Sequence, residues 1–402
     1  MRIRDWIESA KIKYHPVWIK RWNDDPFSVP PVYIEMSPAG ACNHRCTFCA
    51  PEMLGYKTNY LKDSILAERF AEIKELREKD PDGLGIKSIQ FAGEGEPMLH
   101  PKLGKIFGYA RSAGIDVAML SNGVALTEKR IHEILPFTNV YIQISINAGT
   151  AESYALIHKT GTHDWERLWK NLANLVRIKR ESGSTCQIGA NMTILVKEAV
   201  LEDGKRIPPN WPNVEDLAQK ARDTGLDYVS FKPYSQHPYS TETMKLYGDM
   251  SYAGMMDEIM DTGDMLRDRY QTDDFEVIFR FSRFKEYEET DRGYARCLAT
   301  PTLWSYVQAD GVWISCSAHW TNADFHLGNI NTQTINEIWF GERRRQHLEF
   351  MKDFDISVCR KTCHPDKENR YLLKFQQMSP EEQQAELVTL ETLPFPHRGN
   401  VI

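Results

Sequence analysis

One short run of the chain carries most of the information about its architecture: Ala41-Cys42-Asn43-His44-Arg45-Cys46-Thr47-Phe48-Cys49. It places three cysteines in a C-x3-C-x2-C spacing directly after the apolar segment 32–36. Thiolates are soft ligands that suit iron–sulfur clusters and zinc. A [4Fe–4S] cluster usually takes four protein thiolates, so three local ones leave one iron open. An open iron is useful only where another ligand must bind, which makes this run a candidate for chemistry.

The alternative for this run is a structural zinc site that borrows a fourth ligand, for which His44 is the nearest candidate. His44 lies between two of the cysteines, and such tight spacing makes joint ligation of one zinc awkward. Structural zinc sites are usually built from pairs of ligands with a long gap between the pairs. The spacing therefore favours a cluster and leaves zinc as the second hypothesis.

The C-x3-C-x2-C run, with an aromatic residue before the last cysteine, resembles the cluster loop of the radical SAM superfamily. The resemblance implies that Cys42, Cys46 and Cys49 hold a [4Fe–4S] cluster whose open iron binds S-adenosylmethionine (SAM). It also implies reductive cleavage of SAM to a 5′-deoxyadenosyl radical, which abstracts a hydrogen from the substrate. That chemistry belongs to the cofactor, and the protein places and shields it. Phe48 would lie near the adenine, although it also suits an ordinary core position.

The composition is that of a soluble globular protein, with 402 residues, 42% hydrophobic and 26% charged. The net charge of -7 gives no overall basic field for nucleic acid, and the basic run 343–345 suits a solvated helix face. No run of about 18 apolar residues predicts a membrane helix. The first residues lack an apolar signal core, so we expect a cytoplasmic protein whose eight cysteines are metal or redox sites.

Strand and helix patterns alternate after the cysteine run. We expect strands at 32–36, 86–92, 116–120, 140–146, 187–196 and 228–231, with helices between them. Six strands that alternate with helices predict an α/β fold with a parallel sheet, which right-handed crossovers curl toward a barrel. The resemblance implies the same architecture, a partial (β/α)6 radical SAM barrel. In such folds the ligands lie at the carboxyl ends of the strands.

Short polar motifs follow three of these strands: Gly93-Glu94-Gly95-Glu96-Pro97, Ser121-Asn122-Gly123 and Ser145-Ile146-Asn147. The first resembles the family's GGEP motif, which meets the amino group of SAM, with Glu94 where a glycine is more usual. Taken alone, this motif would predict only a turn. Its glycines also allow the backbone to approach a ligand closely. The second resembles a TNG segment, and the third closes the strand where the family places a polar residue near the ribose.

Two lysines complete the expected site. Lys159 lies where many relatives carry an arginine that pairs with the SAM carboxylate, and a solvated lysine at a helix end is the alternative. Lys232 ends the sixth strand, where it either faces the substrate or snorkels to solvent. The resemblance thus implies that SAM is contacted by Phe48, Gly93, Glu94, Gly95, Glu96, Ser121, Asn122, Ser145, Asn147 and Lys159.

A second set of cysteines lies near the end of the chain: Cys297, Cys316, Cys359 and Cys363. A predicted β-hairpin with Asp310-Gly311 at its turn separates the first two, and a helix at 334–351 precedes the last two. Four thiols suffice for one closed [4Fe–4S] cluster or one structural zinc. The layout resembles the twitch domain, a shortened SPASM domain. A full SPASM domain has more cysteines, so the resemblance implies one auxiliary [4Fe–4S] cluster.

Three further residues near these features have less specific roles. Cys186 begins the fifth strand, away from the expected site, and we interpret it as structural. Its alternative role is that of a hydrogen-atom donor, as radical epimerases require. His319 and His364 lie near the auxiliary cysteines, and we expect them at the surface or beside the ligands, not among them.

The resemblance covers residues 32 to about 370 and predicts five parts. They are an N-terminal cap (1–31), a radical SAM core (32–240), a helical bridge (241–290), a small α+β twitch or SPASM-like domain (291–370) and a C-terminal tail (371–402). Within the bridge we expect a helix at 243–269 and then a strand at 275–281. No part suggests a domain for binding a leader peptide, which favours a small molecule, sugar or nucleotide as substrate over a peptide.

The leading hypothesis is a radical SAM enzyme with one auxiliary cluster, served by an electron donor such as flavodoxin or ferredoxin. An auxiliary cluster near a substrate radical is able to take its electron, which suits a net oxidation. An epimerase or mutase with a purely structural auxiliary cluster is the alternative. A non-catalytic iron–sulfur electron carrier or sensor would not explain the motifs at the strand ends. A zinc-containing nucleic-acid binder conflicts with the acidic charge.

Overall fold

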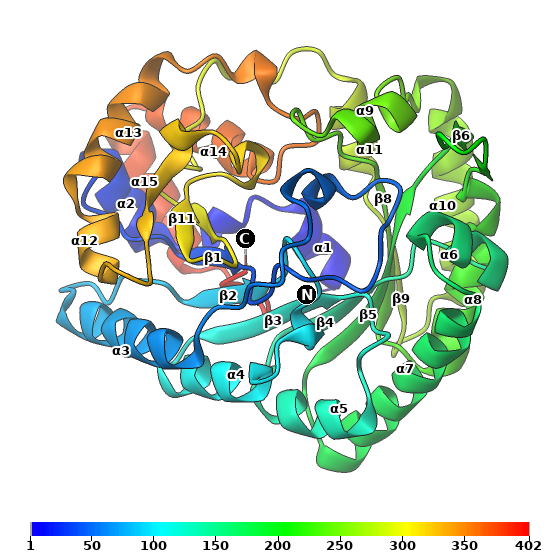
Figure 1. Ribbon diagram of the computed structural model, residues 1–402. Helices are drawn as coiled ribbons and strands as arrows, with labels where there is room; N and C mark the ends of the chain where they lie inside the picture. The colour runs from blue at the N-terminus through cyan, green and yellow to red at the C-terminus, as the bar shows by residue number, and fades with distance from the viewer. Residues whose placement is uncertain (1, 402) are drawn as a thin grey trace.

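The computed structural model describes residues 2–401, in which a ten-stranded sheet curls around a central space and helices cover its outer face (Figure 1). Eight neighbouring strands run parallel, and an antiparallel hairpin extends one edge. In sheet order the strands are β12 (His326–Asn329), β11 (Val312–Ile314), β10 (Trp304–Val307), β1 (Tyr33–Met36), β2 (Ser88–Phe91), β3 (Asp116–Ser121), β4 (Tyr141–Ser145), β5 (Gln187–Ile194), β8 (Tyr228–Pro233) and β9 (Glu276–Phe279).

The helices that connect the parallel strands form the outer layer (Figure 1). They are α3 (Asp63–Lys79), α4 (Leu103–Ser112), α5 (Glu128–Ile134), α6 (Ala151–His158), α7 (His163–Ser182), α8 (Val214–Thr224), α9 (Thr241–Tyr247) and α10 (Met256–Tyr270). The remaining helices are α1 (Ile3–Glu8), α2 (Pro16–Asp24), α11 (Phe281–Glu288), α12 (Ile335–Trp339), α13 (Glu342–Asp353), α14 (Asp366–Gln376) and α15 (Pro380–Glu391). A short ribbon of β6 (Ala199–Val200) and β7 (Arg206–Ile207) stands apart from the main sheet. Among residues 2–401, none of the helices combines the length and apolar composition that crossing a bilayer requires.

Alternation along the strands divides the sheet into an apolar outer face and a polar inner face. Ile34 and Ile89 are buried among the residues that pack against the helices. Their neighbours Glu35 and Gln90 line the central space instead. Successive side chains of a strand point to opposite faces. The sequence therefore builds the core outside the curled sheet and leaves its interior polar enough to hold a ligand.

The structure confirms all six predicted strands, and it adds parallel strands at both edges. β9 confirms the strand expected at 275–281 in the bridge, and it pairs with β8 as part of the main sheet. β10 comes from the segment expected as a separate small domain and pairs in parallel with β1. The residues around the two cysteine sets therefore share one hydrogen-bonded sheet.

Two helices expected to be continuous are interrupted, and glycine accounts for one break. The helix expected at 334–351 is divided into α12 and α13 at Gly341. A Cβ at Gly341 would lie 2.0 Å from the carbonyl oxygen of Glu337, so only glycine fits this close turn. The helix expected at 243–269 is likewise two helices, α9 and α10, with a short irregular segment after Gly248.

Segments from both ends of the chain close the space at the amino ends of the strands. The backbone N–H groups of Ile3 and Arg4 donate to the carboxylate of Glu276. The guanidinium of Arg398 lies over the rings of Tyr141 and Tyr228, with 4.6 and 4.7 Å to the ring centroids. The expected cap and tail thus form a floor under the polar interior.

Arg344 ties the N-terminal segment to the region of the second cysteine set. The sequence predicted a solvated helix face for this basic run, and for Arg344 that is wrong, because its side chain is fully buried. Burial lowers the pKa of Arg344 to about 9. Its guanidinium donates to five backbone carbonyl oxygens, those of Pro26, Phe27, Val29, Pro301 and Trp339.

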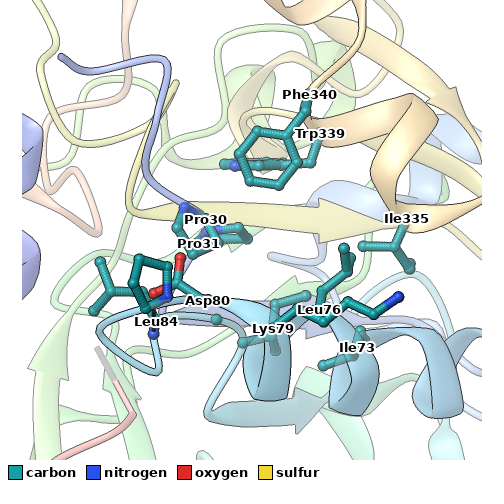
Figure 2. A pocket seen from close by; sticks show the side chains of 13 residues that line it. Pro30, Pro31, Ile73, Leu76, Lys79, Asp80, Leu84, Ile335, Trp339 and Phe340 are labelled. Atoms are coloured by element: carbon teal, nitrogen blue, oxygen red, sulfur yellow. Dashed lines mark hydrogen bonds between the residues drawn. The ribbon is translucent and has the colours of Figure 1, made fainter.

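An apolar groove marks where α12 meets the barrel helix α3. The space of about 250 Å³ lies between the two helices and is bordered by Pro30 and Pro31 (Figure 2). Trp339 closes its upper side, and its indole N–H donates to the carbonyl oxygen of Val29 at 2.8 Å. The groove has few polar groups, so we interpret it as a packing feature between α12 and α3 and not as a catalytic site.

Replacement of Arg344 by methionine should lower the free energy of unfolding by about 3 kcal/mol, because buried carbonyl groups lose their donors. Urea unfolding of the anaerobic protein measures the change. Arg345→Met is the matched control, since the exposed side chain of Arg345 contacts the ring of Phe27 at 3.9 Å and the carboxylate of Glu342 at 3.8 Å and donates to no buried carbonyl group in the described residues. The control should cost about 1 kcal/mol or less. Equal losses in the two variants would contradict the role of Arg344.

Candidate cluster and cofactor site

The three cysteines of the first set lie in the loop that follows β1, and their thiols lie close together. None of them forms a disulfide. Burial raises the pKa of Cys42 to about 12, and repulsion from Glu96 and Cys49 adds to the shift. Burial also raises the pKa of Cys46, with contributions from Cys49 and Cys42. Thiolates at these three positions repel one another, so ionisation of all three is favourable only when a cation or a metal cluster lies between them. The set therefore fits an iron–sulfur cluster.

The glycine-rich loop after β2 packs directly on the cysteine loop. The backbone N–H of Glu96 donates to the carbonyl oxygen of Ala41 at 2.8 Å. A Cβ at Gly95 would lie 2.1 Å from that same oxygen, so a larger residue would separate the loops. Gly93 has φ of 122°, and a Cβ there would lie 1.8 Å from the hydroxyl of Tyr306. Close approach to other parts of the protein requires both glycines. The sequence predicted close approach to a ligand, and that stays a prediction.

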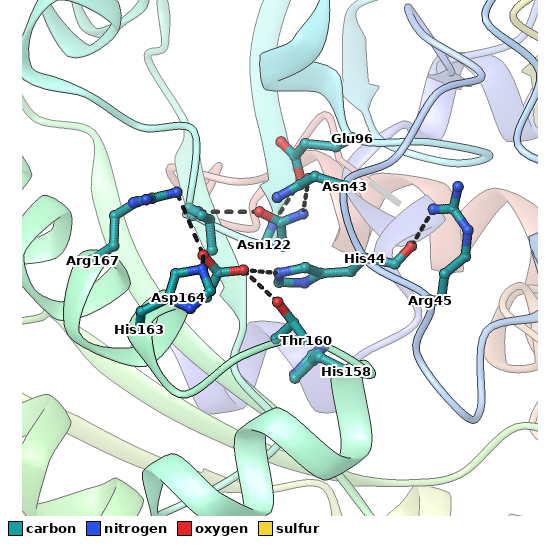
Figure 3. A network of polar contacts seen from close by, with 12 residues as sticks. Asn43, His44, Arg45, Glu96, Asn122, His158, Thr160, His163, Asp164 and Arg167 are labelled. Atoms are coloured by element: carbon teal, nitrogen blue, oxygen red, sulfur yellow. Dashed lines mark hydrogen bonds and ion pairs between the residues drawn. The ribbon is translucent and has the colours of Figure 1, made fainter. Parts of the chain in front are cut away.

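Glu96 joins the two motif loops. One carboxylate oxygen accepts from Ser121 Oγ at 2.7 Å and from the N–H of Met98 at 2.9 Å. The other oxygen accepts from the N–H of Asn122 at 2.7 Å. The side chain of Asn122 then donates to Asn43 Oδ1 at 2.7 Å, which returns the network to the cysteine loop (Figure 3).

Three other residues of the expected SAM site, Glu94, Ser145 and Asn147, lie in different surroundings. Burial raises the pKa of Glu94 to about 7, and its carboxylate accepts from the N–H of Ala309. Asn147 is buried with φ of 57°, and its side-chain oxygen accepts from the N–H of Thr193 at 2.8 Å. Ser145 is half-buried at the end of β4.

Lys159 is exposed and ends α6 in the left-handed conformation, with φ of 50°. Its backbone therefore has a defined role as a helix cap. An interaction of its side chain with SAM stays a prediction.

A buried group of imidazoles lies against the cysteine loop, and sequence reasoning missed it. His158 Nδ1 is 3.0 Å from Cys46 Sγ, and His158 Nε2 is 2.7 Å from the carbonyl oxygen of Ile146. Burial lowers the pKa of His158 to about 3, so the ring is neutral. A neutral ring that donates from Nε2 to a carbonyl presents Nδ1 as an acceptor to the thiol. No spacing signal in the sequence links these residues, which are far apart along the chain.

The zinc hypothesis for the first set receives partial geometric support. His44, Cys46 and His158 offer ligand atoms within 4.8 Å of one another. His44 Nε2 is also 3.3 Å from the carboxylate of Asp164, which accepts from Thr160 as well (Figure 3). A structural zinc takes four ligands, and this group includes only one of the three cysteines. The geometry therefore favours a cluster held by all three thiols.

The four cysteines of the second set converge in space although they span 297–363. Burial raises the pKa of Cys316 to about 12 and that of Cys359 to about 12, and it also raises the pKa of Cys363. Repulsion between the thiolates adds to these shifts, and such an interaction links every pair among the four cysteines. The set therefore fits one closed cluster.

Polar neighbours support these four thiols. Asn369 Nδ2 donates to Cys297 Sγ at 3.5 Å, and His319 Nε2 lies 3.7 Å from Cys359 Sγ. His319 is buried, so it lies beside the ligands and not at the surface, one of the two places expected for it. His364 stacks near the rings of Tyr33 and Trp304.

The polar interior of the sheet is a cavity of about 390 Å³, and residues adjacent in sequence to cysteines of both sets line it. Phe48, next to Cys49, lines one side together with Gly93. Thr362, next to Cys363, lines the other side. Lys232 faces this cavity from the end of β8, which agrees with the first of its two predicted roles. The cavity therefore lies between the two sites where the thiols converge.

Comparison with known proteins identifies the family. The family model described as the radical SAM superfamily matches residues 36–196, and that of an iron–sulfur cluster-binding domain, SPASM, matches residues 297–364. The chain belongs to the radical SAM superfamily. Membership confirms the predicted family and fold class, and it implies SAM and [4Fe–4S] clusters as cofactors. The SPASM match includes all four cysteines of the second set.

Similar proteins include a GTP 3′,8-cyclase of Chlorobaculum tepidum, 25% identical over 51% of this chain and 55% of that protein. A PqqA peptide cyclase of Streptomyces rochei is 30% identical over 30% of this chain and 35% of that protein. The chain thus spans about half, or less, of the length of these relatives. The crystal structure of Streptococcus suis SuiB bound to its precursor peptide SuiA has a TM-score of 0.60 and 14% identity. It covers 90% of this chain and 76% of that one, and this likeness shows the fold alone.

The variant C316A/C359A should lose about half of the iron of the reconstituted protein, because one of two four-iron clusters then lacks two of its ligands. Iron analysis after anaerobic reconstitution measures this loss. Cys186→Ala is the control, since Cys186 is fully buried at the amino end of β5 and outside both sets. An unchanged iron content in C316A/C359A would contradict the assignment of the second set.

Proposed function

We propose that this protein is an enzyme that cleaves SAM reductively and directs the resulting 5′-deoxyadenosyl radical to a small molecule bound in the central cavity. The observation that carries the proposal is that hydrogen bonds join the cysteine loop to two motif loops, and that Phe48 of the cysteine loop and Gly93 of the first motif line the same cavity. When bound, the SAM-binding cluster supplies the electron, and SAM supplies the radical. The residues of this chain hold, orient and shield these groups.

The proposed ligands of the first cluster are Cys42, Cys46 and Cys49. In this proposal Glu96 acts as a positioning residue, because protein N–H and hydroxyl groups already occupy both of its carboxylate oxygens. Gly93 and Phe48 form the cavity wall where SAM would lie. This arrangement needs no side chain at Gly93 and Gly95, in agreement with the close contacts there.

The auxiliary cluster is proposed to be an electron acceptor in a net oxidation. Thr362 lines the cavity and lies between Cys359 and Cys363, which brings the second set close to any substrate in the cavity. An epimerase of the kind that uses a cysteine as hydrogen donor would need a thiol at the cavity. Cys186 is fully buried at the opposite end of its strand, and this argues against such a donor.

A small substrate suits the size and closure of the cavity. Its volume of about 390 Å³ is in the usual range of small-molecule pockets. Trp6 and Arg398 from the terminal segments close its floor. We therefore propose a sugar, a nucleotide or another small molecule over a peptide, and flavodoxin or ferredoxin as the electron donor.

Anaerobically reconstituted protein should convert SAM to 5′-deoxyadenosine and methionine when dithionite reduces it. The variant C42A/C46A/C49A should form none, because the cluster that donates the electron is absent. Cys186→Ala should retain the activity of the wild type. Liquid chromatography with mass detection measures both products. Absence of 5′-deoxyadenosine from fully loaded wild-type protein would contradict the proposed reaction, and zinc in place of iron would support the zinc hypothesis.

Deuterium transfer tests the role of the auxiliary cluster. A deuterated substrate should transfer its label to 5′-deoxyadenosine in both the wild type and C316A/C359A. Only the wild type should then release the oxidised product, because the variant lacks an acceptor for the second electron. Mass spectrometry of both compounds measures the two steps separately. An unchanged product yield from the variant would refute the acceptor role.

A further inference from the structure

The central cavity carries far more positive than negative charge on its walls. Its lining contains one carboxylate, that of Glu35, and six cationic side chains: Lys11, Lys232, Arg280, Arg283, Arg360 and Arg398. Charges in a space with little water interact strongly, so such an excess is unfavourable in the absence of an anion. The partners that each cation already has within the protein show how much negative charge the cavity lacks.

Three of the six cations are accommodated by the protein. Arg283 is paired with Glu286 at 3.0 Å and also donates to the carbonyl oxygen of His364. Arg398 belongs to the floor, where it lies over two tyrosine rings and its Nε donates to the side chain of Gln187, while its Nη2 has no partner among residues 2–401. Lys11 lies over the ring of Trp6, and burial lowers its pKa to about 7.

The other three, Lys232, Arg280 and Arg360, have no carboxylate within ion-pair distance among residues 2–401. Nε of Arg280 and Nε of Arg360 are buried and have no hydrogen-bond partner in this part of the chain. A buried donor without an acceptor is costly, and natural proteins rarely retain one without a purpose.

Mutual repulsion shows that these cations face a common space. Burial lowers the pKa of Lys232 to about 8, with further lowering by Arg280 and Arg360. Burial likewise lowers the pKa of Arg280 to about 10. The acidic group nearest to Arg280 from α1, Glu8, is itself paired with Lys367 at 2.9 Å.

Arg360 faces the auxiliary cysteines and lowers the pKa of Cys316, Cys359 and Cys363, so the negative charge that is missing from the cavity is between about one and two. Glu35 accepts hydrogen bonds from Tyr33 and Gln90 on the opposite wall and offsets one of the three cations. SAM cannot supply the remainder, because its single carboxylate is balanced by its own sulfonium and ammonium charges. A phosphate monoester or a diphosphate carries about two negative charges at neutral pH and presents several acceptor oxygens to guanidinium groups.

We propose that Lys232, Arg280 and Arg360 bind the phosphate or diphosphate group of a small substrate. This rests on the proposed function in taking the cavity as the substrate site. The same cavity has an aromatic wall for the remainder of the molecule, where Trp320 stacks on His237 at 5.2 Å between ring centroids. Neutral sugars and uncharged peptides would leave part of this positive charge without an anionic partner.

Inorganic pyrophosphate is the probe for this site, titrated calorimetrically into anaerobically reconstituted protein at constant ionic strength. Arg280→Gln and Lys232→Gln should each weaken binding about tenfold or more, because each removes a charged donor. Lys170→Gln is the matched control, since Lys170 is exposed on the outer surface of α7. Arg280→Lys should recover part of the affinity, which separates loss of charge from misfolding.

Parallel titrations identify the ligand. Citrate, which offers carboxylates at similar charge, should bind at least tenfold more weakly than pyrophosphate, and equal binding would overturn the assignment to phosphate. SAM affinity should be retained in Arg280→Gln. A loss of SAM affinity with unchanged pyrophosphate binding would assign the cations to the cofactor and overturn the proposal, as would equal effects in Lys170→Gln or no pyrophosphate binding by the wild type.

The same preparations separate this proposal from the proposed reaction. Wild-type protein that binds pyrophosphate but forms no 5′-deoxyadenosine would overturn the radical reaction and leave the anion site intact. Protein that forms 5′-deoxyadenosine but fails to bind pyrophosphate would overturn the anion site alone.

Discussion

One buried carboxylate, that of Glu96, holds together three loops that follow three different strands. Its oxygens accept from the loop after β3 and from its own loop after β2, while its backbone N–H binds the cysteine loop after β1. A carboxylate that accepts several hydrogen bonds fixes the groups that donate to it. The thiols and the cavity wall are therefore placed by a single network at the carboxyl edge of the sheet.

The local part of this arrangement could be predicted from the sequence. The alternating strand and helix patterns located all six expected strands, and the cysteine spacing identified the family, because both signals are local in the sequence. The glycines at 93 and 95 were predicted to approach a ligand, and in the structure each lies close to other protein atoms. Short motifs carry such information because a tight turn restricts the residue types that fit it.

The non-local part could not be predicted. Nothing in the sequence of 241–290 indicated that β9 would join the main sheet, because pairing of parallel strands depends on the whole chain. The contact between His158 and Cys46 and the burial of Arg344 are likewise long-range. The unpaired cations of the cavity come from three distant segments, and only the folded structure shows that they share one space.

The parallel pairing of β10 with β1 has a consequence for electron flow. β1 leads into the loop with the first cysteine set, and the hairpin of β10 and β11 leads into Cys316. Backbone hydrogen bonds join these strands, so the loop with the first cysteine set and the hairpin that leads to Cys316 are anchored in one continuous sheet. An electron that passes between clusters at the two sets would cross a distance that the spacing of these strands helps to set.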